Sequence, residues 1–246
     1  MKTETKPINS PDAIIRRLRL LIIVTIGIWA VAAYLFLPWW WRVHVRRHPA
    51  LYYAPTVTHT HNGIPGDPLN IALIGTEDEV VSAMCAAGWS PADPITPKSS
   101  LRIISSTLRD KPYEDAPVSD LMLFGHKQDF AFEQMVGDSP DKRHHVRFWR
   151  SPVANHRYQP LWLGAATFDT RVGLSHTTGQ VTHHVGPDID AERDLIVSNL
   201  RAAGALQDEY WVNDFQAKRT GKNGGGDPWH TDGRLAVAVL KLLLRH

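Results

Sequence analysis

The longest run of apolar positions lies near the N-terminus, where residues 20–41 carry no charged side chain. At a rise of about 1.5 Å per residue, a helix of this length spans a hydrocarbon core of about 30 Å. Three consecutive tryptophans close the run, and indole rings favour the interface between membrane and water. The pattern therefore predicts a transmembrane helix over 20–41, preceded by an N-terminal tail over 1–19.

A cleaved signal peptide is the alternative to an uncleaved anchor. The apolar run is longer than the core of an ordinary signal peptide, and the residues at its end are too large for a signal peptidase. We therefore expect an anchor. Lys2, Lys6 and three arginines precede the run, whereas three arginines follow it. Because basic residues concentrate on the cytoplasmic side, this excess predicts a cytoplasmic tail, a single pass of the inner membrane and an extracytoplasmic domain.

Beyond the apolar run, residues 42–68 are rich in proline, glycine and histidine, and we expect a juxtamembrane linker there. From residue 69 onward, most short stretches alternate between apolar and polar positions, as in half-buried strands. The predicted helices cover 76–88, 96–108 and 188–204, and the predicted strands cover 69–74, 118–124, 130–135, 145–149, 161–174, 180–185, 209–216 and 234–244. Thr76, with Glu79 three residues later, has the spacing of a capping box. We expect one α+β domain over 69–246, built on a mostly antiparallel or mixed sheet.

The composition is that of an ordinary folded protein, with 43% hydrophobic and 21% charged residues in a chain of 246. The formal net charge is only +2, whereas a dedicated nucleic-acid-binding protein has a strongly basic surface. We therefore expect no nucleic-acid partner. Cys85 is the one cysteine of the sequence, which excludes an internal disulfide and a cysteine-based zinc site.

The densest group of chemically capable side chains lies where a predicted strand turns through Gly-Pro into a predicted helix. A cluster of histidine and aspartate at such a turn suits a divalent metal ion. The predicted metal ligands are His183, His184, Asp188 and Asp190. In the alternative, the aspartates cap the helix, Arg193 forms an ion pair with one of them, and one histidine is packed in the core.

Asp169 lies in the preceding strand, and an antiparallel hairpin would bring its carboxylate near His184. A carboxylate and a histidine can share general acid–base work, or bind a metal ion that activates water. The predicted catalytic residues of such a hydrolase are His184, Asp169, Asp190 and Arg193. The sequence contains neither a His-Glu-x-x-His motif nor a Gly-x-Ser-x-Gly motif, so no recognised catalytic signature supports this prediction.

Two other groups are predicted to bind a ligand. His145, Arg147 and Trp149 share one face of a predicted strand, and an arginine with a histidine beside an aromatic ring suits an acidic group. The alternative is the solvated face of a half-exposed strand. Trp229 and His230 lie in a glycine-rich stretch that lacks the Gly-Lys-Ser/Thr ending of a nucleotide-binding loop. We expect this stretch to be a surface loop or a flap over a pocket.

Five blocks of sequence follow one another in the globular part. They are FGHKQDFAFEQ (124–134), RHHVRFWR (143–150), LWLGAATFD (161–169), THHVGPDIDAERD (182–194) and GGGDPWHTDGRLAVAVL (224–240). In their order and spacing the chain resembles the LssY C-terminal domain family over about residues 67–243. The resemblance implies a bacterial envelope setting and a link to lipid or phosphate-ester chemistry in a neighbouring protein.

Relatives in that family often follow a multi-helix membrane phosphatase domain of the phosphatidic-acid type. This chain has one predicted span and none of the signatures of that phosphatase, so the resemblance does not imply phosphatase activity.

Three hypotheses for the function follow. The first is a membrane-tethered binding or accessory module for a lipid headgroup, a glycan or an envelope protein, and the nine tryptophans and the basic residues beside the span favour it. The second is a metal-assisted or His/Asp acid–base hydrolase of phosphate esters or lipids, with a divalent metal ion as cofactor. The third is a structural scaffold in an envelope complex. We prefer the first, because no catalytic signature supports the second.

Overall fold

The computed structural model describes residues 11–40, 49–92, 121–137, 142–155, 158–177, 179 and 181–241. The predicted helix over 96–108 lies outside these residues. The chain divides into two compact units, Met1–Pro49 and Ala50–His246.

Over its described residues 11–40, the N-terminal unit is one helix. It comprises α1 (Pro11–Val31), the π-helical turn η1 (Ala32–Phe36) and a further turn that ends at Trp40. The helix has 30 residues, it is strongly apolar, and no side chain of α1 is buried. It is therefore long and apolar enough to cross a membrane. It begins before residue 20 because Pro11 suits the first position of a helix, where its missing N–H is no loss, and Asp12 favours the first turn.

The globular unit has the predicted α+β composition. Its helices in the described residues are α3 (Pro49–Tyr52), α4 (Glu77–Ala86) and α6 (Ile189–Ala202). Its strands there are β1 (Val57–Thr60), β2 (Pro65–Pro68), β3 (Ile71–Ile74), β4 (Ser90–Pro91), β5 (Leu121–Leu123), β6 (His126–Lys127), β7 (Phe130–Met135), β8 (Arg143–Arg150), β9 (Leu161–Leu174), β10 (Val181–Val185), β11 (Leu206–Val212), β12 (Thr220–Lys222), β13 (Pro228–His230) and β14 (Leu235–Leu240). Residues 49–68, which we had expected to belong to a linker, contribute α3 and the β1–β2 hairpin to this unit.

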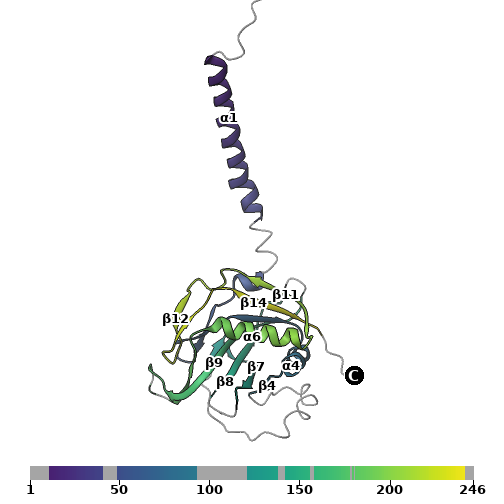
Figure 1. The fold of residues 1–246 in the computed structure, drawn as a ribbon, viewed down its shortest axis with the longest axis vertical. Helices are drawn as coiled ribbons and strands as arrows, with labels where there is room; N and C mark the ends of the chain where they lie inside the picture. The colour runs from purple at the N-terminus through teal and green to yellow at the C-terminus, as the bar shows by residue number, and fades with distance from the viewer. Residues whose placement is uncertain are drawn as a thin grey trace, which may run out of the picture. The chain divides into compact units, whose positions relative to one another are not determined.

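One large sheet forms the centre of the globular unit, in the order β11-β14-β3-β9-β8-β7-β4, and β10 extends it by pairing with β9 (Figure 1). Within the described residues, β14 and β3 run parallel, and the other neighbouring strands of this sheet run antiparallel. The sheet is therefore mixed and mostly antiparallel, as predicted. A smaller sheet, β2-β1-β5-β6, and the β12–β13 hairpin accompany it.

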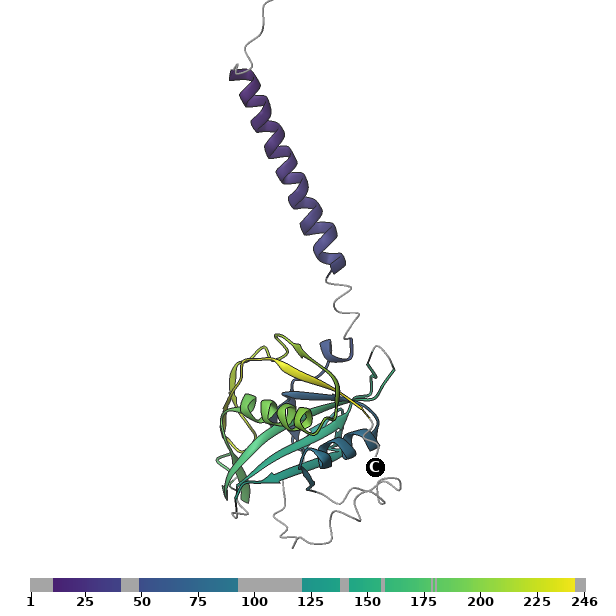
Figure 2. The same cartoon turned by 45° about the vertical axis from the view of Figure 1, so that its right-hand side comes forward.

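The two longer helices of this unit, α4 and α6, cover one face of the large sheet (Figures 1 and 2). Their apolar side chains, such as Met84 and Ile196, join strand residues such as Phe148 in one buried cluster. Alternate strand residues, such as Trp149 and Leu163, form a second buried cluster on the opposite face. Because successive side chains of a strand point to opposite faces, strands that are apolar throughout can bury both faces.

Both longer helices begin at a capping residue. Thr76 Oγ1 accepts a hydrogen bond from Glu79 N, and Glu79 Oε2 accepts one from Thr76 N, which is the predicted capping box. At α6, the Asp188 side chain accepts hydrogen bonds from the amides of Asp190 and Ala191, both at 3.1 Å. These caps satisfy amides that have no partner inside the helix, and they fix where each helix begins.

Asn70 connects the large sheet to α6. It is buried just before β3, and its side chain continues the hydrogen-bond ladder to β9: Oδ1 accepts from Ala166 N at 2.9 Å, and Nδ2 donates to Ala166 O at 3.0 Å. Nδ2 also donates to Ile189 O at 2.7 Å, which is the first residue of α6. Asn70 thereby holds the start of α6 against β9.

Candidate functional site

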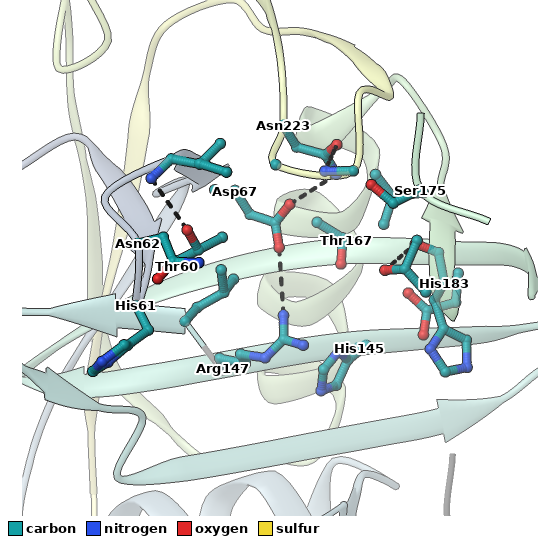
Figure 3. A pocket seen from close by; sticks show the side chains of 18 residues that line it. Thr60, His61, Asn62, Asp67, His145, Arg147, Thr167, Ser175, His183 and Asn223 are labelled. Carbon is teal, nitrogen blue, oxygen red and sulfur yellow. Dashed lines mark hydrogen bonds and ion pairs between the residues drawn. The ribbon is translucent and has the colours of Figure 1, made fainter. Parts of the chain in front are cut away.

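A cavity of about 330 Å³ lies where β8, β9 and β10 meet the β1–β2 hairpin and the glycine-rich loop before β13. We call it the pocket, and Figure 3 shows the side chains that line it. Its polar lining comprises Thr60, His61, Asn62, Asp67, His145, Arg147, Thr167, Asp169, Ser175, Thr182, His183 and Asn223. Segments far apart in the sequence therefore supply its walls.

Strand pairing places the side chains on the floor of the pocket. His145 of β8 lies opposite Thr167 of β9, and Arg143 lies opposite Asp169. Alternate residues of a strand share a face, so His145, Arg147, Thr167 and Asp169 all point to one side of the sheet. Residues between them, such as Val146, point to the helix-covered side. The pocket therefore lies on the face of the sheet that α4 and α6 leave uncovered.

Arg147 and Asp67 form a buried ion pair in the pocket. Arg147 Nη1 lies 3.4 Å from Asp67 Oδ2, and Asn223 Nδ2 donates to Asp67 Oδ1 at 3.2 Å. Arg147 is only 6% exposed, and its Nε forms no hydrogen bond within the described part of the chain. Burial raises the pKa of Asp67, and Arg147 and Asn223 offset only part of this rise. The guanidinium thus has unused donor capacity beside a carboxylate whose charged form is disfavoured by burial.

The surroundings of His145 disfavour its charged form. Burial lowers its pKa well below the usual value, and the charges of Arg147 and Arg143 lower the pKa further. A neutral imidazole offers one hydrogen-bond donor and one acceptor. His145 can therefore form hydrogen bonds in the pocket without adding a second positive charge beside Arg147.

Arg143 binds two carboxylates at the edge of the pocket. Its Nη1 lies 2.8 Å from Glu133 Oε2, and its Nε lies 3.0 Å from Asp169 Oδ2. Its Nη2 lies 3.5 Å from His183 Nε2. The guanidinium of Arg143 is therefore compensated by two acids, whereas the described residues give Arg147 one acidic contact, at 3.4 Å.

The adjacent histidines of β10 belong to different surroundings. His183 lines the pocket, whereas His184 is buried with its Nδ1 2.7 Å from Asp227 Oδ1. β9 and β10 form an antiparallel hairpin, with a bulge between His184 and Val185. Asp169 lies opposite Val185 and lines the pocket. The hairpin therefore brings the carboxylate of Asp169 into one cavity with His183, whereas we had expected it near His184.

The remaining candidates from the start of α6 form a network outside the lining of the pocket. Asp188 caps the helix, as described above. Arg193 is 1% exposed, and it contacts Asp190 at 3.0 Å, Asp232 at 2.9 Å and Asp194 at 2.8 Å. Burial alone would lower the pKa of Arg193, but hydrogen bonds to Asp194 and Asp232 outweigh it and raise the pKa. These contacts agree with the second interpretation of the sequence, in which the aspartates cap the helix and one of them pairs with Arg193.

Trp149, Trp229 and His230 are also outside the lining of the pocket. Trp149 lies on the same face of β8 as His145 and Arg147. Arg147 still lines the pocket, whereas Trp149 belongs to the second buried cluster. Trp229 is buried, whereas His230 is exposed. Five residues in two groups were expected to bind a ligand, and His145 and Arg147 are the two of them that line the pocket.

Sequence interpretation missed Asp67, Asn223 and Asp227. Asn223 Oδ1 accepts hydrogen bonds from Gly225 N at 3.0 Å and from Asp227 N at 2.9 Å, and these bonds fold the glycine-rich loop. An asparagine directly before glycines is a turn signal that could have revealed this fold. The loop is held to the rest of the unit through Asn223 and Asp227, so it forms a wall of the pocket.

The four predicted metal ligands do not meet at one point. His183 lines the pocket, His184 contacts Asp227, and Asp188 caps α6. Among the described residues, the histidine and acidic side chains close enough to hold one ion are those of His176, His184 and Asp227.

Comparisons with known proteins point to one family. A family model described as LssY C-terminus matches residues 51–235, which is more than half of the chain. The match begins before the β1–β2 hairpin and includes Asp67, Arg147 and Asn223. Searches of the curated proteins and of the solved structures find no match.

Proposed function

The chain belongs to the LssY C-terminus family, and we propose that its globular domain is a membrane-tethered binding module whose pocket receives an acidic group of a ligand. The group is a phosphate or a carboxylate, carried by a lipid headgroup, a glycan or an envelope protein. The buried side chain of Arg147 carries this proposal, because it lines the pocket with donors that the described residues leave unused.

The guanidinium of Arg147 presents five N–H donors in a planar fork that matches the oxygens of a phosphate or a carboxylate. In the pocket it has one contact of 3.4 Å with Asp67. A buried donor without a partner costs about 1–3 kcal/mol, and more when the group is charged. An oxyanion beside Arg147 would supply these hydrogen bonds, and this gain would favour binding.

The surroundings of Arg147 suit an anion in two further respects. Neutral His145 and the hydroxyl groups of Thr167 and Ser175 offer hydrogen bonds to ligand oxygens. Burial raises the pKa of Asp67 and so works against its charged form, which weakens Asp67 as a counter-ion for Arg147. A ligand anion would take over this role.

The size of the pocket limits the ligand. A volume of about 330 Å³ lies at the lower end of the range for small-molecule sites, which is about 300–1,000 Å³. Such a cavity holds a headgroup or a sugar rather than an acyl chain. We therefore place a lipid headgroup or an acidic glycan before a protein as the ligand.

The N-terminal helix supplies the tether. We propose that it is an uncleaved anchor in the inner membrane of a bacterial envelope and that the globular domain lies on the extracytoplasmic side. The excess of basic residues before the apolar run supports this orientation. The hydrolase alternative remains a prediction. It has four catalytic candidates, and Asp169 is the one among them that lines the pocket.

The test measures binding of inorganic phosphate, glycerol 1-phosphate and glucuronate to the full-length protein in a mild detergent by calorimetry. We expect Arg147→Met to weaken binding of at least one of these anions by about 10–100-fold, which corresponds to the loss of a charged hydrogen bond. Arg150→Met is the matched control, because Arg150 lies on the same strand, is exposed and contacts Glu77 at 3.5 Å. This control should bind as the wild type does.

Loss of Arg147 also leaves Asp67 without its counter-ion, which could unfold the protein. The double variant Asp67→Asn/Arg147→Met removes both charges. It is expected to fold and to bind the anions as weakly as Arg147→Met does. Wild-type affinity in either folded variant would refute the proposal. So would equal weakening by Arg150→Met, because the effect would then reflect net charge alone.

A further inference from the structure

Three side chains outside the lining of the pocket converge at one point: His176 of the loop after β9, His184 of β10 and Asp227 of the glycine-rich loop. Their candidate ligand atoms all lie within 4.8 Å of one another. We propose that they form a binding site for a divalent cation of the zinc type. This site is independent of the acidic group that we propose for the pocket.

The side chains of His184 and Asp227 are held in place before any ion binds. His184 and Asp227 are buried, and Asp227 Oδ2 accepts a hydrogen bond from Val185 N at 3.2 Å. The His184 ring packs over Gly173, where a Cβ atom would lie 2.8 Å from Nε2. Only glycine at this position leaves room for the imidazole. A preorganised carboxylate and imidazole lose little side-chain entropy when they bind an ion.

His176 completes the set from the solvent side. It is exposed, its ring centroid lies 5.1 Å from that of His184, and its backbone N donates to Gly225 O at 2.9 Å. The backbone contact anchors the loop that carries His176 to the loop that carries Asp227. Because His176 is exposed, an ion can reach the group from solvent.

The donor types select the cation. Two imidazole nitrogens and one carboxylate oxygen suit Zn²⁺, which binds these groups with tetrahedral geometry. Mg²⁺ and Ca²⁺ prefer sites made of oxygen ligands. Three protein ligands leave one tetrahedral position for water or another group.

An ion at this site would join three parts of the pocket wall. Ser175 and His183 line the pocket directly before His176 and His184 in the sequence, and Gly225 lines it two residues before Asp227. A ligand that binds only the folded protein stabilises it in proportion to its affinity and concentration. The cation is therefore expected to stabilise the fold and to rigidify the wall that Asn223 and Gly225 form.

The test uses full-length protein purified in detergent without a polyhistidine tag. The chain is stripped with a chelator and titrated with Zn²⁺, and bound metal is measured by mass spectrometry. Co²⁺ in its place gives a visible absorption spectrum that reports the geometry of the ligands. We expect one Zn²⁺ per chain at the tightest site, and His176→Ala should weaken it by about a hundredfold or more, since even outer-shell changes cost 10–100-fold.

His126→Ala is the matched control, because His126 also contacts an aspartate, Asp129, at 3.1 Å, but the described part of the chain offers this pair no third metal-binding side chain. It should leave the tight site unchanged. His176→Ala removes an exposed side chain and is expected to fold, so it decides the question even if His184→Ala unfolds. Asp227→Asn keeps an oxygen for Val185 N and should also lose the tight site. Wild-type affinity in folded His176→Ala, or equal preference for Mg²⁺, would overturn the proposal.

Discussion

Replacement of Asn70 with alanine is expected to lower the free energy of unfolding of the globular unit by about 3–5 kcal/mol. The side chain of Asn70 forms three hydrogen bonds, two with the backbone of Ala166 and one with Ile189 O. It is 1% exposed, so water cannot replace it without opening the structure. Alanine removes all three bonds at once.

The magnitude follows from the partners that are left behind. Each hydrogen bond contributes about 1 kcal/mol net, and a buried partner left unsatisfied costs about 1–3 kcal/mol. Ala166 N would lose its acceptor, and the carbonyl groups of Ala166 and Ile189 would each lose a donor. Three such losses, taken near the lower end of these values, amount to about 3–5 kcal/mol. This is a large part of the total stability of a typical domain, which is about 5–15 kcal/mol.

Urea unfolding of the full-length protein in a mild detergent measures this change, and tryptophan fluorescence reports it through the buried Trp149 and Trp162. Asn199→Ala is the matched control, because Asn199 forms one partly buried bond with Gln134 and lies in α6, where alanine favours the helix. The control should change stability by less than about 1 kcal/mol. A loss of the same small size in Asn70→Ala, with an unchanged urea dependence, would refute the reasoning.

Two further outcomes are expected. Burial holds the pKa of His145 in the folded protein well below its ordinary value, so the unfolded chain binds a proton at this histidine at a higher pH than the folded chain does. The free energy of unfolding should therefore fall as the pH drops below about 6.5. His145→Gln should lose less stability than the wild type between about pH 7.5 and pH 5, and an equal loss would assign the effect to other groups. An alkaline phosphatase fused to the C-terminus should be active in a bacterial host and a green fluorescent protein there dark, and the reverse result would place the domain in the cytoplasm.

Much of the fold could be predicted from local patterns, because the alternation of apolar residues and the capping residues act within a few positions of the chain. The strand over 161–174 has the predicted bounds, and the capping box at Thr76 and Glu79 has the predicted hydrogen bonds. The mixed, mostly antiparallel sheet also agrees with the alternation in the sequence. Residues 49–68 were expected to be a linker because their prolines and glycines are typical of one, yet proline at a strand end does not prevent the pairing of β1 and β2.

The pocket was harder to foresee, because its partners meet only through tertiary structure. The sequence pattern shows that Arg147 and His145 share a face, but it contains no signal that Asp67 lies opposite Arg147, 80 residues earlier. Likewise, Asp190 and Arg193 are chemically capable in any pattern, and only their contacts with Asp232 show that they belong to one network. Residue types suggested the chemistry, whereas the register and the loops decided which groups meet.

The two adjacent histidines show how much depends on that register. His183 faces the pocket and His184 faces Asp227, because successive side chains of a strand point to opposite sides. The bulge after His184, where Thr170 Oγ1 donates to His184 O at 2.9 Å, keeps this division while Val185 still pairs with Asp169. A shift of the hairpin by one residue would exchange the surroundings of the two histidines. The β9–β10 hairpin therefore shapes both the pocket and the proposed cation site, and the two sites share one structural support.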